Sequence, residues 1–211
     1  EEYVKNQREF YSDVPDTGRD FLRESLDANI ENRIIADIGC GAGDDLLIYR
    51  KMGAKKVIGI EPSLKMLEQK NFDDKFNDNI EILAGEFENI PLADESVDFV
   101  TARFSFHHVE NLEEAFKEVA RILKKNGLFL IVTRNPEFDT KIAKDQNLKK
   151  GEKIKDSIFN GRFVVESIPH KPEDYLSKTC LKYFEVEENK PYSMNEDGEK
   201  MDGLLLRLKR K

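Results

Sequence analysis

The sequence predicts an α/β protein built on a doubly wound, seven-stranded, mostly parallel sheet with a C-terminal antiparallel hairpin. Short apolar runs alternate with amphipathic segments across residues 33–135, which is typical of buried parallel strands covered by helices on both faces. Within this pattern the stretch IADIGCGAGDD carries glycine at alternate positions directly after the first apolar run. Two β-rich segments joined through the polar turn NEDGEK close the chain, and they predict the hairpin.

Five of the apolar runs are predicted as parallel strands because each is short and is bounded by glycine or polar residues. They are RIIADI (33–38), KKVIGIE (55–61), NIEILAGE (79–86), VDFVTARF (97–104) and GLFLIVT (127–133). The hairpin strands are YFEVEENK (183–190) and GLLLRLKR (203–210).

The segments between the strands carry apolar residues at helical spacing. The best helix is NLEEAFKEVARILKKNG (111–127), with one apolar stripe and Gly127 just past its end. SLKMLEQK (63–70) is a further helix with Ser63 as its N-cap, and residues 44–54 form another that closes at Gly53. Helices are also predicted in TGRDFLRESLDAN (17–29) and from KPEDYLSKTCLK (171–182), where Pro172 occupies the first turn.

Composition limits the classes of protein to which the chain can belong. The 211 residues suffice for one domain, and a net charge of -8 disfavours a nucleic-acid partner. Cys40 and Cys180 lie far apart and form no CxxC pair, so neither a zinc site nor a disulfide framework is expected, and no metal constellation is visible. No apolar run approaches a membrane span, and the first residues lack the apolar core of a signal peptide. We expect a cytoplasmic protein.

The glycine stretch marks the candidate ligand site. In a doubly wound sheet the ligand lies beyond the carboxyl ends of the strands, usually at the first strand–helix turn. Gly39, Gly41 and Gly43 allow positive φ and a close approach of backbone to ligand. A dinucleotide-binding fingerprint needs one more glycine, but Asp44 or Leu46 occupies that position, depending on the register.

Acidic residues around the turn indicate the charge of the ligand. Asp44 and Asp45 stand at the start of the following helix, where a pyrophosphate would need positive potential. Glu61 ends the second strand about 20 residues after the glycines, where a carboxylate can accept hydrogen bonds from ribose hydroxyls. The sequence therefore predicts a cationic or zwitterionic ligand that contains a nucleoside but little phosphate.

Four stretches resemble the successive motifs of class I S-adenosylmethionine-dependent methyltransferases, in particular the small-molecule methyltransferase type. They are IIADIGCGAGDD, VIGIEPSLKML, LAGEFENIPLADESVDFVTARFSFHHV and EEAFKEVARILKKNGLFLIV. The resemblance spans about residues 33–135 and depends on several motifs in order. It implies the Rossmann-like methyltransferase fold, with S-adenosylmethionine as cofactor and S-adenosylhomocysteine as product.

The resemblance also implies roles for individual residues in binding the cofactor. Its methionine part would lie against the glycine turn, its ribose on the acid of the second strand, and its adenine along the next turn and the loop after the third strand. The residues in these positions are Asp37, Gly39, Cys40 and Gly41 at the methionine part, Glu61 at the ribose, Pro62, Ser63, Glu86 and Phe87 at the adenine, and Arg103 and Phe104 again at the methionine end.

Glu86 and Tyr11 are the two expected cofactor contacts that the family's motifs support least directly. At the position of Glu86 the family more often has Asp, so the adenine contact would be made by a longer side chain. Tyr11 lies in the N-terminal segment, and on the ground of this position alone we expect it to close over the cofactor.

The acceptor side carries candidates for catalysis. The stretch RFSFHHV follows the fourth strand instead of the Asn/Asp-Pro-Pro-aromatic run of nucleic-acid amino methyltransferases. A histidine ordinarily titrates near neutrality, so His107 is a candidate base, although the family commonly packs a His of this stretch beneath the loop. His170 and Tyr175 are candidates for the acceptor pocket, the alternative being a helix-capping His170 and a core Tyr175.

The remaining acceptor candidates lie in the insert that follows the fifth strand. Arg134 and Asn135 open this insert and Arg162 lies within it, and either arginine would suit an acceptor carboxylate or phosphate.

Together these observations predict one domain that moves a methyl group to O, N or C of a small molecule by in-line displacement. We expect an N-terminal helical cap (1–31), a cofactor-binding core (32–135), an acceptor lid (136–171), and a closing helix and hairpin (172–211). The alternatives are a protein, carrier-bound or RNA acceptor, or a non-catalytic cofactor-binding protein. A NAD-dependent oxidoreductase would need the missing glycine.

Overall fold

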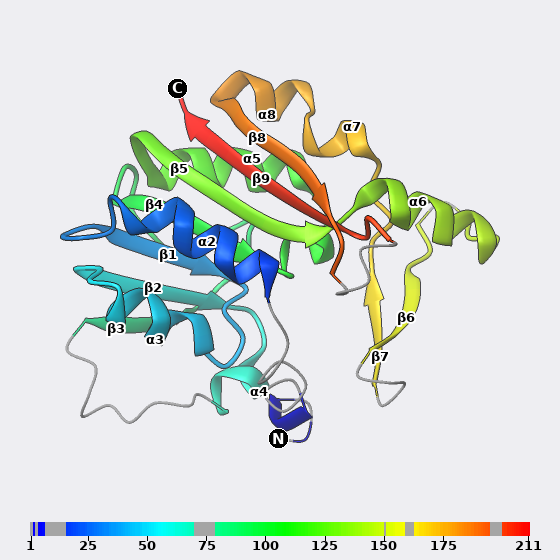
Figure 1. Cartoon of the computed structure of the whole chain (residues 1–211), viewed down its shortest axis with the longest axis horizontal. Helices are drawn as coiled ribbons and strands as arrows, with labels where there is room; N and C mark the ends of the chain where they lie inside the picture. Colours follow the sequence, from blue (N-terminus) through cyan, green and yellow to red (C-terminus); the bar gives the residue numbers. More distant parts are fainter. Residues whose placement is uncertain are drawn as a thin grey trace.

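The computed structural model describes residues 2, 4–6, 16–69, 79–149, 151–158, 163–194 and 200–211. Its main feature is a seven-stranded sheet in the order β3-β2-β1-β4-β5-β9-β8, which confirms the predicted fold class (Figure 1). The strands are β1 Ile34–Ile38, β2 Lys56–Glu61, β3 Ile80–Ala84, β4 Val97–Arg103, β5 Leu123–Arg134, β8 Phe184–Tyr192 and β9 Gly203–Arg210.

The pairing of the strands fixes the place of the site. β1 to β5 run parallel to one another, whereas β9 pairs antiparallel with both β5 and β8. Strand order reverses between β1 and β4, because the chain builds outward from β1 to β3 before it returns to add β4. The carboxyl ends of β1 and β4 therefore form the crevice at which ligands of such sheets bind.

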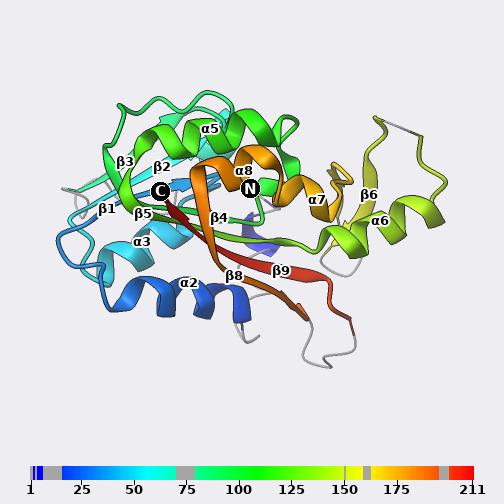
Figure 2. The same cartoon turned by 90° about the horizontal axis from the view of Figure 1, so that it is seen from above.

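Helices cover both faces of the sheet, as Figure 2 shows, with α5 and α8 on one face and α2 and α3 on the other. The two faces have separate clusters of buried apolar residues. The helices are α2 Thr17–Asp27, α3 Asp44–Lys51, α4 Leu64–Leu67, α5 Leu112–Ile122, α6 Pro136–Asp145, α7 Pro172–Tyr175 and α8 Lys178–Tyr183, with a 3-10 helix η2 at Phe106–His108. Among the described residues, no helix combines the length and apolar character needed to cross a bilayer.

The helix α5 begins as its pattern predicts but ends at Ile122, because residues 123–127, expected at its C-terminal end, already belong to β5. Asn111 caps its start by accepting a hydrogen bond from the backbone N–H of Glu114, and its apolar stripe is buried. Beneath it the ring of Phe106 is fully buried and lies edge-on to several aromatic rings, including Phe116 at 5.3 Å and Phe129 at 5.4 Å. This packing holds η2, and with it the end of β4, in a fixed place.

The structure differs from the sequence prediction in the insert and around two helices. Residues 136–171, which showed little pattern, form α6 and the antiparallel strands β6 Ile154–Ile158 and β7 Phe163–Ser167, which lie beyond the carboxyl end of β5 (Figure 1). The single helix predicted from residue 171 is two short helices, α7 and α8. The helix predicted at 63–70 spans only Leu64–Leu67, and residue 70 lies outside the described residues.

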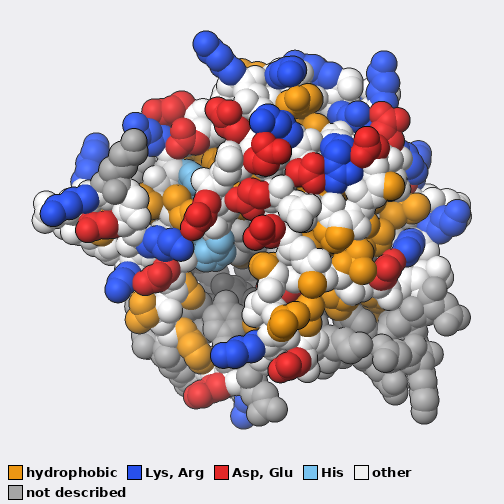
Figure 3. All heavy atoms as spheres, turned by 180° about the vertical axis from the view of Figure 1, so that it is seen from behind, with side chains coloured by type: hydrophobic (Ala, Val, Ile, Leu, Met, Phe, Trp, Pro, Cys, Tyr) orange, Lys and Arg blue, Asp and Glu red, His pale blue; other side chains and the backbone are white. Residues whose placement is uncertain are grey.

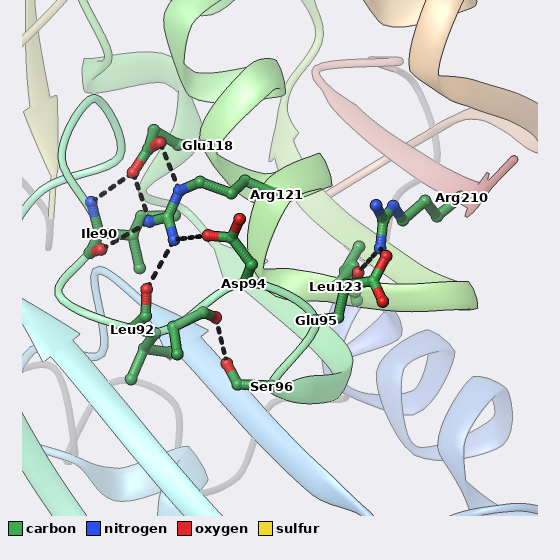
Figure 4. A network of polar contacts seen from close by, with 10 residues as sticks. Ile90, Leu92, Asp94, Glu95, Ser96, Glu118, Arg121, Leu123 and Arg210 are labelled. Atoms are coloured by element: carbon green, nitrogen blue, oxygen red, sulfur yellow. Dashed lines mark hydrogen bonds and ion pairs between the residues drawn. The ribbon is translucent and has the colours of Figure 1, made fainter.

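The loop between β3 and β4 is tied to α5 by one arginine (Figure 4). Arg121 donates to the carbonyl oxygens of Ile90 and Leu92 at 2.9 and 2.7 Å, and it pairs with Asp94 and Glu118. Glu118 in turn accepts from the backbone N–H of Ile90 at 3.1 Å. The network therefore fixes residues 90–94 of the loop whose first residues carry the predicted adenine contacts.

Replacing Arg121 with Met is expected to lower the free energy of unfolding by about 1–3 kcal/mol, because two loop carbonyls lose their charged donor. The control is Lys117→Met, which removes only an exposed pair with Glu114 on the same helix and should leave stability nearly unchanged. Urea unfolding of both variants measures the difference. Equal effects would show that the arginine network contributes no more than a surface ion pair.

Candidate active site

The glycine turn directly follows β1 at the crevice between β1 and β4. Gly39, Gly41 and Gly43 have φ values of 76°, 58° and 85°, the left-handed region that favours glycine. The backbone N–H groups of Gly39 and Cys40 donate to the carbonyl of Ile60 on β2, at 2.7 and 3.2 Å. The turn is thus bonded to the neighbouring strand at the carboxyl edge of the sheet.

At Gly39 a side chain of the protein itself, Ser105, comes close to the backbone. A Cβ at this position would lie 2.3 Å from the Cβ of Ser105, whose hydroxyl donates to the carbonyl of Ile38 at 2.7 Å. At Gly41 the nearest atom would be the methyl group of Met66, at 3.2 Å. From the sequence we expected the approach of a ligand to require these glycines. The structure shows that at Gly39 both the backbone conformation and the packing of Ser105 require glycine.

Glu61 links the second strand to this turn. One carboxylate oxygen accepts from the backbone N–H of Gly41 at 2.9 Å, and the other accepts from that of Ser63, also at 2.9 Å. The residue is 7% exposed. A carboxylate has about four acceptor sites, so two remain for hydroxyl groups of a ligand. Next to it Pro62 is exposed and Ser63 caps α4, as predicted from the sequence.

Asp37 lies at the bottom of the crevice and is 3% exposed. Its Oδ1 accepts from the hydroxyl of Thr101 on β4 at 2.8 Å. Burial, followed by the charge of Asp45, raises the pKa of Asp37 from 3.8 to about 7, and the Thr101 hydrogen bond and Arg103 oppose the shift only in part. Among the described residues, no arginine is bonded directly to this buried acid.

A cluster of buried charges that sequence reasoning missed lies beside the turn. Asp45, in the first turn of α3, accepts from the Nε atoms of Arg19 at 2.9 Å and of Arg103 at 2.5 Å. Arg103 Nη1 also lies 3.5 Å from Asp16 Oδ2 at the N-cap of α2. Burial acts to raise the pKa of Asp45, but Arg103 and Arg19 outweigh it and hold that pKa below its usual value.

The other predicted cofactor residues are placed as follows. Phe104 has φ 51° and its N–H donates to Val132 at 2.7 Å, so this amide is already bonded within the protein. Cys40 is half-buried, and its sulfur would lie 2.7 Å from a Cβ built on Gly59. Glu86 is exposed, whereas the ring of Phe87 is buried 5.0 Å from that of Phe106, which leaves only its main chain for a ligand.

Two acceptor-side candidates, His107 and Tyr175, meet at Thr133 near the end of β5. The hydroxyl of Thr133 lies 3.3 Å from Nδ1 of His107 and also hydrogen-bonds the phenol of Tyr175. His107 is buried, and its ring lies 4.0 Å from that of His108. Burial first, then the neighbouring His108 and Arg134, hold the pKa of His107 well below its usual value, so His107 is neutral at pH 7.

His170 contacts the same group of residues from the other side. Its Nε2 donates to the carbonyl of Val109 at 2.9 Å, and its ring lies edge-on to that of Tyr175. It does not cap α7, because Asp174 instead accepts from the N–H of Lys171 at the start of that helix. Tyr175 is 2% exposed, as in the alternative that placed it in the core. In Figure 3 the surface is hollowed beside a histidine side chain.

Arg134 and Asn135 hold the insert to the sheet. Arg134 donates through Nε to Asp139 on α6 at 2.8 Å and through Nη1 to Asp156 on β6 at 2.7 Å. Asn135 caps α6 through Glu137 N–H and donates to the carbonyl of Met201 at 2.7 Å. Their acceptor role stays a prediction. Tyr11 and Arg162 lie outside the described residues.

Known proteins similar to this chain agree with the architecture. Residues 36–131 match the family model described as "Methyltransferase domain". The uncharacterized methyltransferase YcgJ of Bacillus subtilis is 32% identical over 52% of this chain and 43% of its own length. The ubiquinone/menaquinone biosynthesis C-methyltransferase UbiE of Campylobacter jejuni is 29% identical over 68% of this chain and 64% of its own. The chain thus spans less than two thirds of either relative.

A solved structure, an S-adenosylmethionine dependent methyltransferase from Mesorhizobium loti, superposes with a TM-score of 0.67. The match covers 89% of this chain and 96% of that one at 18% identity. At this identity the likeness shows the fold alone, which is that of the class I methyltransferases.

Residues 36–131 thus match a methyltransferase domain, and the chain has the fold of the class I S-adenosylmethionine-dependent methyltransferases. The methyltransferase domain and the fold that the sequence predicts are confirmed.

The buried acid Asp37 makes stability depend on pH. Because its pKa is raised from 3.8 to about 7, the folded protein keeps a proton that the unfolded chain has lost, and stability falls as pH rises between these values. The slope is at most about 1.4 kcal/mol per pH unit. Asp37→Asn removes this dependence, so the stability of the wild type minus that of the variant should decrease from pH 5 to pH 7.

Urea unfolding of the ligand-free proteins at pH 5, 6 and 7 measures this difference. A difference that stays constant, or that grows with pH, would contradict a raised pKa for Asp37.

Proposed function

We propose that this protein transfers a methyl group from S-adenosylmethionine to O, N or C of a small-molecule acceptor. The observation that carries the proposal is the pair of buried acids, Asp37 and Glu61, on either side of the glycine turn where strand order reverses. A crevice with this charge suits a ligand that brings positive charge and hydroxyl groups.

The residues present fit the cofactor. Glu61 is oriented by the backbone N–H groups of Gly41 and Ser63, and its remaining lone pairs suit the two ribose hydroxyls. Asp37 is buried and has no bonded cation in the described part of the chain, so an ammonium group beside it would favour the ionised carboxylate. The adenine is expected along Pro62 and Ser63 and against the backbone of Glu86 and Phe87.

The cofactor supplies a methyl carbon already activated by the sulfonium, so the protein has to align the acceptor and exclude water. An O or N acceptor can also require removal of a proton. For that step we propose His107, which burial keeps neutral. Its ring would donate Nδ1–H to Thr133 Oγ1, 3.3 Å away, and leave Nε2 free to accept the proton.

The acceptor is proposed to lie beyond the ends of β4 and β5. His107 and His170 come from different segments there, and Arg134 fastens α6 and β6 to the same sheet edge. Both acids that pair with Arg134 belong to the insert. The main role of the Arg134 guanidinium would therefore be to hold the insert in place. Among the relatives, UbiE is named as a C-methyltransferase, which keeps carbon among the possible acceptor atoms.

Ligand-induced stabilisation tests the cofactor assignment. S-adenosylhomocysteine at 100 times its dissociation constant should add about 2.7 kcal/mol to the free energy of unfolding, whereas NAD should add nothing. A clear effect of NAD, or none of S-adenosylhomocysteine, would overturn the proposal. Incubation with a labelled methyl donor and a metabolite library then identifies the acceptor by the labelled product.

Substituting Glu61 by Gln should weaken S-adenosylhomocysteine binding on the order of 10- to 100-fold, because a charged acceptor of the ribose hydroxyls is lost. Glu81→Gln is the matched control: this exposed glutamate on the next strand pairs with Lys56 and lies outside the site. Isothermal titration calorimetry measures both affinities. Unchanged binding by the Glu61 variant would refute the ribose role.

A further inference from the structure

The amino-acid carboxylate of the cofactor has no partner in the roles assigned so far. Four acids lie at the turn or one side chain away from it, namely Asp16, Asp37, Asp45 and Glu61. The cations among the described residues of this cluster are Arg19 and Arg103. A carboxylate placed among these acids would be repelled unless it reached one of the two arginines.

Arg103 is committed within the protein. Its Nε bonds Asp45 at 2.5 Å, its Nη1 lies 3.5 Å from Asp16, and its side chain is only 10% exposed. It neutralises Asp45 and links β4 to the start of α2. We therefore consider it an anchor of the cluster.

Arg19 is held differently. Its Nε bonds Asp45 at 2.9 Å, but Nη1 is 3.9 Å from Asp16, beyond hydrogen-bond distance, and its side chain is 22% exposed. Within the described part of the chain, the terminal nitrogens of Arg19 thus have no hydrogen-bond acceptor. One edge of the guanidinium is fixed, and the other remains available for a planar anion.

The position of Arg19 is suitable for this contact. It lies in the first turn of α2, which packs on the same face of the sheet as α3 (Figure 2). Asp45, to which it bonds, is near enough to Asp37 and Cys40 to raise the pKa of each. Arg19 is therefore linked, through the side chain of Asp45, to the place where the methionine part of the cofactor is expected.

We propose that Arg19 binds the amino-acid carboxylate of S-adenosylmethionine, with Asp45 orienting its guanidinium. The inference rests on the proposed function, and it makes α2 part of the cofactor site. Asp37 and Arg19 would then hold the ammonium and the carboxylate of the same amino acid, one charge each.

The test compares two ligands that differ in the carboxylate alone, S-adenosylmethionine and decarboxylated S-adenosylmethionine. The wild type should bind the carboxylated ligand on the order of 10- to 100-fold more tightly in calorimetry. Arg19→Met should abolish most of this preference while binding the decarboxylated ligand within about threefold of the wild type. Arg19→Lys, which retains the charge, should recover part of it.

The matched control is Arg33→Met, which removes an arginine–aspartate pair with Asp98 at the opposite end of the strands and should leave the preference intact. A wild type without preference overturns the inference even if no variant folds. An Arg19→Met protein that loses affinity for both ligands equally overturns it as well, because Arg19 would then only support the fold. A wild type that binds neither ligand instead refutes the proposed function itself.

Discussion

The constraint on which this structure depends is the concentration of buried carboxylates at the reversal point of the sheet. Each is stabilised in a different way: Glu61 by two backbone N–H groups, Asp45 by two arginines, and Asp37 by one threonine hydroxyl. Asp37 is the least compensated, and its pKa rises to about 7 for that reason. A ligand with positive charge relieves this cost, so the site is electrostatically complementary to a sulfonium amino acid before one arrives.

The surrounding elements serve to keep these groups in place. The buried ion cluster ties α2 and α3 to the end of β4, and Arg121 ties the loop after β3 to α5. Arg134 does the same for the insert by pairing with one acid on α6 and another on β6. Three arginine-centred contacts thus attach α2 with α3, the loop between β3 and β4, and the insert to one sheet.

The sequence predicted the sheet, α2, α5 and the closing hairpin, because apolar periodicity and capping residues are local signals. It also placed Glu61 beside the glycine turn, since strand ends meet at one edge. The charge cluster had no such signal: Arg19 and Arg103 lie 26 and 58 positions from Asp45. Nor could local patterning show that Ser105 packs on Gly39, or that the insert pairs its strands within itself.

His107, Thr133 and Tyr175 lie together near the insert that Arg134 fixes. We propose that the methyl acceptor binds at this place. The central claim, that the two acids receive the nucleoside and its amino acid, is tested most directly by a crystal structure with S-adenosylhomocysteine. Our account predicts both ribose hydroxyls on Glu61 and the ammonium group beside Asp37. A ligand whose ribose points away from Glu61, or that lies outside the crevice between β1 and β4, would contradict it.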